Sequence, residues 1–308
     1  MVSQSNLLKG LGWITVSVLV WVPLFPVAKR VLPIVDAFTL GSVRYAIGIV
    51  LLVALVVAIE GRQALRYEGR FLTAAMFGLI GITGFNAFVW YGLTFTRPEH
   101  AAIIMGTQTP LIALIVWMTR GIRPAGFTLA CVAAAFAGVL LVVTKADPAS
   151  VLAGGTLAGD LLVFLGALSW ITYTLAAARF PRWSPLRWTV LTCLPGTAGL
   201  FIVNFIAIRG GIAAVPSLEA LGSIGWQIAY FAIGTVVLGV LGFNFSVKYL
   251  GPLNTMLTLN LVPVGVFAIE AALGRNFAAI EIGGAALVIG ALVANNLYLR
   301  RRSTAGSG

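Results

Sequence analysis

The sequence predicts an all-α integral membrane protein with ten transmembrane helices, arranged as two inverted five-helix repeats around a central cavity. Three observations favour this fold class. The 308 residues are 60% hydrophobic and only 9% charged, whereas soluble domains carry roughly 25% charged residues. The apolar residues fall into ten runs of about 20 residues, the length that crosses a bilayer. Several distinctive residues of the first half also recur in the second half.

Each predicted span is bounded by residues that interrupt helices or prefer loops. Asp147-Pro148 marks one such loop. Proline is tolerated at a helix start, where its missing N–H has no partner to lose, and the prolines near predicted starts are Pro98, Pro124, Pro185 and Pro252. The predicted spans are 8–29, 36–59, 71–95, 98–119, 125–144, 157–180, 185–207, 222–248, 252–273 and 278–299.

The five runs of the first half each have a distinguishing feature. The run 8–29 is followed by further apolar runs and lacks a clear cleavage site, so it is read as a span and not as a removable signal peptide. The second run contains Arg44, the third a Gly84-Phe85-Asn86 motif, and the fourth an internal Pro110. The fifth run, like the tenth, has small residues at four-residue spacing, which lets helices approach closely. We assign these two runs to packing or dimer contact.

The second half repeats these features in the same order. Trp21 matches Trp170 at an offset of 149 residues, Pro110 matches Pro263 at 153, and the Gly-Phe-Asn motif recurs at Gly242 after 158, so insertions or deletions separate the matches. Five spans are an odd number, so the second copy must enter the membrane from the opposite face. Such inverted repeats are typical of carriers. The predicted units are 1–148 and 149–302, followed by a disordered tail, 303–308.

The basic residues predict the orientation. With the N-terminus inside, 13 Lys and Arg residues lie on the inner side and 6 on the outer side, and Arg44 lies within the second span. Cytoplasmic loops are enriched in Lys and Arg, so both termini are expected in the cytoplasm. Nine or eleven spans would place the C-terminal arginine cluster outside. The net charge of +11 follows from these loops and does not indicate a nucleic-acid partner.

The predicted substrate cavity is built on the duplicated segments that contain polar residues and proline. Such interrupted pairs are the best sequence indication of a transporter's binding site. Pro110 and Pro263 are predicted to loosen the fourth and ninth helices, which then bend as gates. Trp21, Trp90 and Trp170 are informative because tryptophan prefers the membrane interface. The predicted substrate-binding residues are Trp21, Asn86, Trp90, Tyr91, Gln108, Trp170, Tyr173, Asn244 and Asn260. For each one, interhelical bonding or plain packing is the competing interpretation.

Charged residues inside the spans are scarce. Arg44, about eight residues into its span, is the most costly to bury and is expected to meet backbone carbonyls or a substrate carboxylate. Glu270 is predicted to pair with Arg275 at the outer interface, and Lys248 to extend toward the inner one. The spans carry no acid at the midplane, and His100 lies near the outer boundary. We therefore predict no dedicated carboxylate proton switch.

Motifs for catalysis or metal binding are missing from the sequence. It contains no phosphate-binding loop, zinc-protease motif or nucleophile elbow. Cys131 and Cys193 both fall inside apolar runs and form no disulfide framework. We expect no enzyme and no cofactor. The expected partners are the lipid bilayer and a small-molecule substrate, and the chain is expected to be a monomer or a homodimer.

The chain resembles the drug/metabolite transporter superfamily and its EamA-type ten-helix repeat. The residues that carry the resemblance are Arg44, Pro110, and the succession Pro263, Glu270, Gly274 before a glycine-rich last helix. The first half departs from the pattern, with Trp117 where the repeat would place the acid. Within the superfamily the chain looks most similar to the YddG-type amino-acid exporters of bacterial inner membranes. That resemblance implies a central cavity lined by the helices other than the fifth and tenth.

We predict an alternating-access exporter of aromatic and other neutral amino acids or related small metabolites. A multidrug or cationic-metabolite exporter of the same fold is the alternative, although cationic substrates favour a carboxylate partner. A lipid flippase, a membrane-embedded enzyme and a channel fit less well. An enzyme needs clustered acid, histidine or cysteine residues, and an inverted repeat broken by proline suits a rocking carrier better than a static pore.

Overall fold

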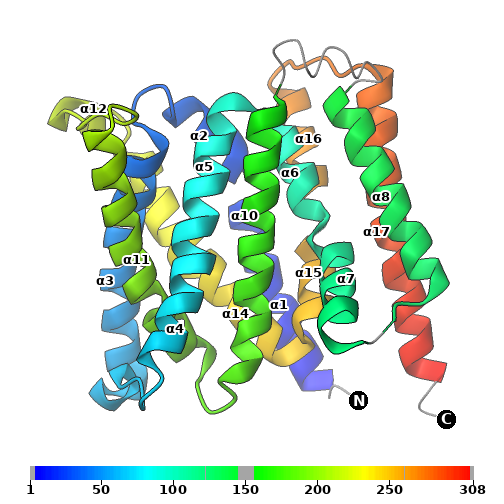
Figure 1. The fold of residues 1–308 in the computed structure, drawn as a ribbon, viewed down its shortest axis with the longest axis horizontal. Helices are drawn as coiled ribbons and strands as arrows, with labels where there is room; N and C mark the ends of the chain where they lie inside the picture. The colour runs from blue at the N-terminus through cyan, green and yellow to red at the C-terminus, as the bar shows by residue number, and fades with distance from the viewer. Residues whose placement is uncertain (1–3, 122, 145–155, 260, 306–308) are drawn as a thin grey trace.

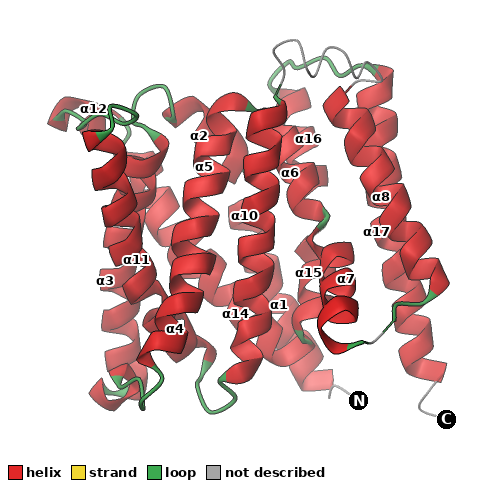
Figure 2. Cartoon of the chain, viewed as in Figure 1, coloured by secondary structure: helices red, strands yellow, loops and turns green. Residues whose placement is uncertain are grey.

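The computed structural model describes residues 4–121, 123–144, 156–259 and 261–305, and this part of the chain consists of helices, turns and loops, without a strand (Figure 2). Eight helical segments are long and apolar enough to cross a membrane. Two shorter apolar helices, Gly126–Val142 and Ala279–Asn295, stand at the predicted fifth and tenth spans. The predicted all-α membrane fold is confirmed.

The helices follow the predicted spans closely, with several spans divided into two or three pieces. The first five spans are α1 (Gln4–Trp21) with α2 (Leu24–Val31), α3 (Ala37–Glu60), α4 (Phe71–Gly78) with η2 (Leu79–Gly84) and α5 (Phe85–Phe95), α6 (Pro98–Gly106) with α7 (Gln108–Arg120), and α8 (Gly126–Thr144). The last five are α10 (Leu157–Ala176), α11 (Pro185–Arg209), α13 (Gly225–Ala229) with η4 (Tyr230–Val240) and α14 (Leu241–Leu250), α15 (Pro252–Leu259) with α16 (Leu261–Ala272), and α17 (Ala279–Ala305). Short helical turns, η1 (Arg62–Leu65), η3 (Ala177–Arg179) and α12 (Leu218–Ser223), lie at the span ends.

Both ends of the described chain lie on one face of the bundle, which we call the terminal face (Figure 1). The connections 61–70, 121–125 and 180–184 lie on the same face, and the connections 32–36, 210–217 and 273–278 lie on the opposite face. The first five spans therefore finish opposite their start, and the next five run in the reversed sense. This is the predicted inverted repeat.

Side-chain caps define where long spans begin. The carboxylate of Asp36 accepts the backbone N–H groups of Phe38 and Thr39, both at 2.9 Å, at the start of α3. Ser184 caps α11 in the same way, immediately before Pro185. These contacts satisfy amides that have no partner within the helix. Gly121 ends α7 in a left-handed conformation (φ +68°), which a glycine adopts without strain.

The fourth span is divided at an internal proline, and the ninth span contains a matching proline. Proline has no N–H to donate to the carbonyl four residues earlier, and its ring collides with that carbonyl. The residue four before Pro110 is Gly106, where α6 ends, so this proline interrupts its span at the position that its chemistry dictates. The residue four before Pro263 is Leu259, and residue 260 lies outside the described residues.

The third and eighth spans contain another matched irregularity, which the sequence did not reveal. η2 and η4 are π-helical segments, a wider winding that is rare and often found near functional sites. η2 ends at Gly84, two residues before Asn86, and η4 ends at Val240, four residues before Asn244. The first Gly-Phe-Asn motif therefore begins with the last residue of η2, and the second begins two residues after the end of η4.

The fifth and tenth spans pack against each other at one side of the bundle, where α8 and α17 stand together (Figure 1). A Cβ atom added to Gly138 would lie 2.6 Å from the carbonyl oxygen of Gly284, and one added to Gly284 would lie 2.8 Å from that of Gly138. The two backbones touch at these glycines. The small residues of these spans thus form a contact within the chain.

Candidate functional site

A central cavity of about 70 Å³ lies among seven spans, at the level where the fourth is divided into α6 and α7. A water molecule occupies about 10–15 Å³ by this measure, so the cavity has room for a few waters in this state. Its walls are mainly aromatic and aliphatic, with a few polar groups. The lining residues are Trp21, Leu24, Phe25, Arg44, Tyr45, Phe85, Ala102, Met105, Gly106, Gln108, Trp170, Thr235, Val236, Val240, Leu259, Val262 and Pro263.

Arg44 is the charged group of this cavity. It projects from α3 and is 3% exposed. One terminal nitrogen donates to Thr235 Oγ1 at 3.3 Å and the other to Asn86 Oδ1. Among the described residues, no carboxylate pairs with Arg44, and its Nε is buried without a hydrogen-bond partner. A buried cation without a counter-ion is costly, so this site is suited to an anionic group supplied from outside.

The amide of Asn86 holds Arg44 in place. Its Oδ1 accepts from Arg44 and also from Trp90 Nε1 at 2.8 Å. Its Nδ2 donates to the carbonyl of Ile82, within the π-helix, at 2.6 Å. The ring of Trp90 lies 4.2 Å from the guanidinium carbon of Arg44, a cation–π geometry. Asn86 and Trp90 therefore act behind the cavity wall, through the orientation of Arg44.

Aromatic rings form the wall that includes Trp21 and Trp170. The two indoles meet edge to face at 5.8 Å, and Phe85 and Phe243 lie 5.1 and 5.2 Å from Trp170. Trp21 Nε1 donates to the backbone carbonyl of Thr235 at 3.2 Å, which fixes the ring. This wall offers planar, apolar surface, with Arg44 elsewhere on the same cavity.

A second, larger cavity of about 940 Å³ opens at the terminal face; we call it the vestibule. Residues of the terminal-face connections surround its mouth, and α7, α10, α11 and α14 supply its walls. Arg123, Pro124, Ala125 and Thr128 also line it, so the start of the fifth span contributes, against the expectation that this span lies outside the cavity. The polar lining residues are Arg123, Thr128, Thr174, Arg182, Trp183, Ser184, Trp188, Asn244 and Lys248.

Asn244 lines the vestibule and is the counterpart of Asn86. Its Nδ2 donates to Tyr173 Oη at 2.9 Å and to Thr189 Oγ1 at 2.8 Å. Each asparagine of the repeated motif thus bonds to the second span of its own repeat, Asn86 to Arg44 and Asn244 to Thr189. Asn244 lies six residues from the terminal-face end of its span, and Asn86 nine residues from the opposite end of its span. Inversion of the repeat places the two amides in opposite halves of the membrane.

An ion pair closes one side of the vestibule mouth. Arg187 donates to the carboxylate of Glu68 at 2.9 Å, and Trp183 Nε1 donates to the same group at 3.3 Å. These hydrogen bonds, with the charges of Arg187 and Arg182 nearby, hold the pKa of Glu68 below its ordinary value. A lowered carboxyl pKa stabilises the folded contact above the unfolded pKa. That stability is lost as the pH falls through the folded pKa.

The structure separates the predicted site residues into groups. Trp21, Gln108, Trp170 and Pro263 line the central cavity, and Asn244 lines the vestibule. Asn86 and Trp90 contact Arg44 from behind, and Tyr173 bonds Asn244. Pro110 is buried in α7. Tyr91 lies apart, packed on Phe38 and Phe95 at 5.1 and 5.0 Å. Asn260 lies outside the described residues.

Several cavity residues were not in the predicted set. Phe25 lies one helical turn beyond Trp21, and Phe85 directly precedes Asn86, so both could have been found from their neighbours. Thr235 is the only hydroxyl between Phe231 and Val240 in an otherwise apolar run. A lone hydroxyl in such a run is a weak signal, because threonine is common in membrane helices.

Comparison with known proteins agrees with this architecture. The model of the EamA-like transporter family matches residues 8–144 and 157–297, one match for each half. The chain is 30% identical over 285 residues to the Bacillus subtilis (strain 168) protein "Uncharacterized transporter YrdR", covering 91% of this chain and 89% of that one. It is 29% identical over 276 residues to "Uncharacterized transporter YyaM" of the same strain, covering 89% of each chain.

More distant similarities extend over most of the chain. An Archaeoglobus fulgidus protein named "Uncharacterized transporter" is 28% identical over 243 residues, covering 75% of this chain and 80% of its own. A solved structure described only as "Crystal structure of protein" superposes with a TM-score of 0.67 at 22% identity, covering 97% of this chain and 99% of that chain. At that identity the superposition shows a shared fold alone.

Proposed function

We propose, from the premise that this chain is a membrane transporter belonging to the EamA-like transporter family, that it exports aromatic and other neutral amino acids. The proposed cycle is alternating access, in which the central cavity opens to one face at a time. The proposed location is a bacterial inner membrane with both termini in the cytoplasm, which agrees with the excess of Lys and Arg on the terminal face.

The main support for the proposed substrate comes from the contacts of Arg44. It is a buried guanidinium on the cavity wall whose contacts among the described residues are uncharged, and its Nε has no hydrogen-bond partner there. A carboxylate accepts paired hydrogen bonds from a guanidinium with good geometry. The carboxylate of an amino acid would supply the missing counter-ion.

The internal prolines of the fourth and ninth spans leave backbone carbonyls that offer a partner for the amino end of the same substrate. Pro110 cannot donate to the carbonyl of Gly106, and Pro263 cannot donate to that of Leu259. Gly106 and Leu259 both line the cavity. Carbonyls freed in broken membrane helices are suited to cations. In the proposed complex they meet the ammonium group, while Trp21 and Trp170 meet the side chain.

The cavities support a cycle with two states. The vestibule opens at the terminal face, while the central cavity is too small for an amino acid the size of phenylalanine. Admission therefore requires the walls to separate, and the internal prolines of the fourth and ninth spans, Pro110 and Pro263, provide hinges. A single chain contains every residue of the proposed site, so a monomer is sufficient for this cycle.

Export of drugs or metabolites that are cations is the alternative within the same fold. A cation favours a carboxylate partner, and the lining residues of the two cavities include none. Arg44 would repel such a substrate. Neutral amino acids therefore fit the lining better.

Three ligands with one aromatic ring each separate these proposals. Purified protein is heated with phenylalanine, with phenylpropionate, which lacks the amine, or with phenethylamine, which lacks the carboxylate. A ligand that binds the folded state raises the melting temperature. We expect the largest rise with phenylalanine, a smaller rise with phenylpropionate and none with phenethylamine. A rise with phenethylamine that equals or exceeds that with phenylalanine would favour the cationic alternative and contradict our proposal.

A further inference from the structure

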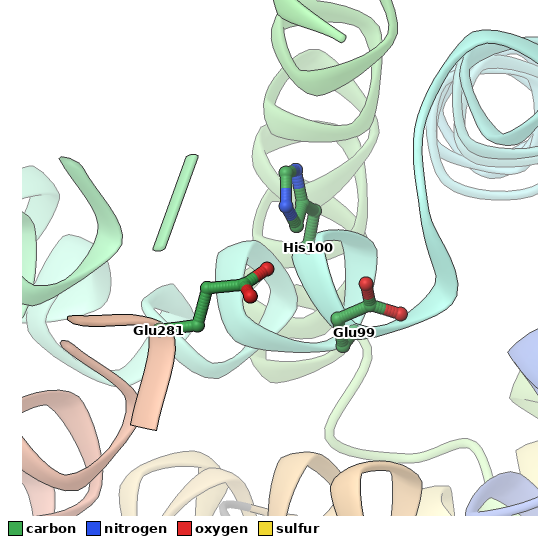
Figure 3. A group of neighbouring side chains, drawn as sticks. All are labelled: Glu99, His100 and Glu281. Carbon is green, nitrogen blue, oxygen red and sulfur yellow. The ribbon is translucent and has the colours of Figure 1, made fainter. Parts of the chain in front are cut away.

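The end of the bundle opposite the vestibule is closed around a cluster of buried ionisable side chains. Figure 3 shows three of them, Glu99 and His100 at the start of α6 and Glu281 at the start of α17. They are 0–1% exposed, and Asp160 of α10 beside them is 5% exposed. Ionisable groups buried in a membrane protein are costly and usually functional. This cluster belongs neither to the central cavity nor to the vestibule.

Two of the carboxylates are neutralised by arginines. Arg275 forms ion pairs with Glu99 and, at 3.2 Å, with Glu281, and Arg97 reaches Glu281 at 3.7 Å. Arg275 thus pairs with these residues in place of Glu270, the partner expected from the sequence. The pairs Arg275–Glu99 and Arg97–Glu281 both join the first repeat to the second.

Asp160 has a different partner. Its carboxylate accepts hydrogen bonds from the hydroxyls of Thr96 and, at 2.7 Å, Thr156. Its ionic contact is with His100, whose Nδ1 lies 3.5 Å from Asp160 Oδ1, and the ion pairs among the described residues give it no lysine or arginine. Two hydroxyls supply hydrogen bonds but no charge, so the imidazole of His100 is the group among the described residues that could supply a counter-ion to Asp160.

His100 is surrounded by charges from every neighbouring element that carries one. A ring nitrogen of His100 and carboxylate oxygens of Glu99 and Glu281 all lie within 4.8 Å of one another. His100 Nε2 is buried without a hydrogen-bond partner in the described part of the chain. Arg30 of α2 is an exposed cation near Glu270. The other charged or titratable groups that the structure describes on its own and neighbouring elements are Lys29, Arg97, Glu99, Asp160, Glu270, Arg275 and Glu281.

The cations of that set are already engaged. Lys29 donates to the carbonyls of Leu93 and Thr96, both at 2.6 Å, at the end of α5. Arg97 and Arg275 are held by the glutamates. The protonation state of His100 thus decides whether the carboxylate of Asp160 is compensated.

We propose that His100 and Asp160 form a proton-binding latch that links closure of this end to pH. With His100 protonated, the imidazolium–carboxylate pair ties α6 of the first repeat to α10 of the second and holds the end shut. When His100 releases its proton to water, Asp160 remains as a buried carboxylate without a counter-ion, which destabilises the closed arrangement. Opening hydrates Asp160, and reprotonation of His100 restores the pair.

The latch replaces the sequence-based expectation of no proton switch. That expectation rested on the lack of an acid at the midplane and on the place of His100 near the outer boundary, and it did not consider that Asp160 of the second repeat lies opposite His100. Histidine changes its charge between about pH 5 and 8, and the chain contains one histidine. The latch is independent of which substrate is carried.

A distance measurement across the closed end tests the latch. Spin labels are attached to Phe95→Cys in the first repeat and Leu273→Cys in the second, both half-exposed, in a background of Cys131→Ala and Cys193→Ala. In lipid nanodiscs at about pH 5.5 we expect one short distance. At about pH 8.5, beyond the range in which histidine titrates, we expect a longer-distance population to appear.

Substitutions test whether His100 and Asp160 cause the change in distance between the two pH values. His100→Gln and Asp160→Asn should each abolish the difference between the two pH values. Glu60→Gln, which removes a carboxylate charge at the terminal face, should preserve it. Identical distances at both pH values with the latch intact, or a full pH response in His100→Gln, would overturn the proposal.

A second measurement needs no substitution in the latch and therefore does not depend on the folding of a variant. In protein labelled with ¹⁵N-histidine, after removal of any tag, the one imidazole signal reports His100 directly. We expect this signal to titrate with the same midpoint as the distance change. An imidazole that stays neutral throughout, or titrates at a different pH, would overturn the proposal. Neither measurement uses a substrate, so failure of the amino-acid proposal would not affect them.

Discussion

At the scale of single residues, the proposed function depends on a guanidinium that the fold leaves without a counter-ion. Arg44 is held by Asn86, Thr235 and the ring of Trp90. These contacts orient the cation without neutralising it. A substrate that binds beside Arg44 is therefore expected to carry a negative charge into the central cavity.

Substitution of Arg44 tests whether the carboxylate of the substrate binds to this side chain. Arg44→Gln should raise the dissociation constant for phenylalanine by about tenfold to a hundredfold, because a hydrogen bond to a charged group contributes roughly 1.5–3 kcal/mol. Arg209→Gln, an exposed arginine at the end of α11, is the matched control and should leave the constant unchanged. Calorimetric titration in detergent measures both. Equal affinities in Arg44→Gln and the control would exclude the proposed carboxylate contact.

Asn86 is predicted to matter for stability as well as for orientation. Asn86→Ala leaves the donors of Arg44 and Trp90 Nε1 without their shared acceptor. A buried group left unpaired costs about 1–3 kcal/mol. We expect a clear fall in the midpoint of thermal unfolding. Thr94→Ala on the same helix, whose exposed hydroxyl bonds only the backbone of Tyr91 among the described residues, should change it little.

The sequence analysis identified some residues of the central cavity but did not predict which contacts each of them makes. Tryptophans away from the interface and prolines within spans are recognisable because they violate ordinary preferences, and Trp21, Trp170 and Pro263 do line the cavity. Tyr91 follows the same motif but faces Phe38 and Phe95. The direction of a side chain near a π-helix depends on the local winding, which periodicity at 3.6 residues cannot supply.

At the scale of elements, the break in the fourth span is the part whose cause is clearest. Pro110 stands four residues after the end of α6, as the missing N–H requires. The sequence was sufficient here because the cause is local. The π-helices of the third and eighth spans have no such local signal and were not predicted.

The hinge role of the two prolines predicts a kinetic effect. Pro110→Ala and Pro263→Ala each restore a backbone N–H that can donate to the carbonyl four residues earlier, and they should stiffen both spans. We expect transport of phenylalanine to slow at least several-fold in the double variant, with phenylalanine still bound. Pro216→Ala, in the connection 210–217 on the opposite face, should transport normally. Unchanged turnover in the double variant would rule out gating at these positions.

The contact between α8 and α17 predicts a difference between neighbouring glycines. Gly284→Ala places a Cβ 2.8 Å from the carbonyl oxygen of Gly138 and 2.9 Å from Leu141 Cβ, whereas nothing lies within 4 Å of a Cβ at Gly283. Overpacking of this kind costs about 1–3 kcal/mol. Gly284→Ala should therefore lower the thermal midpoint, and Gly283→Ala should not. Equal thermal midpoints in the two variants would show that α8 and α17 can move apart without a loss of stability.

At the scale of the whole molecule, inversion of one five-span unit explains the matched features of the fold. The two family matches, the paired internal prolines and the paired π-helices all fall at corresponding places in the two halves. The vestibule lies at one end and the cluster of cross-repeat ion pairs at the other. The two repeats have the same architecture in opposite orientations. Rocking of one repeat against the other would therefore close the open end and open the end that the ion pairs hold together.

The fold could be predicted because membrane spans are long, apolar and bounded by proline, glycine and charge. The cluster of ionisable residues at the end opposite the vestibule could not be predicted. Glu99, His100, Asp160 and Glu281 lie on three different helices, and only the packing of the repeats brings them together. Spacing along one span showed His100 near a boundary and gave no sign that Asp160 would face it.

Counterflow in proteoliposomes is the measurement that tests the central claim most directly. Vesicles containing reconstituted protein are loaded with unlabelled phenylalanine and diluted into a trace of labelled phenylalanine. A carrier whose one cavity opens alternately exchanges the two, so the account predicts a transient accumulation of label above equilibrium, weaker in Trp170→Ala and missing from vesicles loaded with phenethylamine. Uptake no greater than in protein-free vesicles would contradict transport of phenylalanine, and entry of label without a transient excess would contradict alternating access.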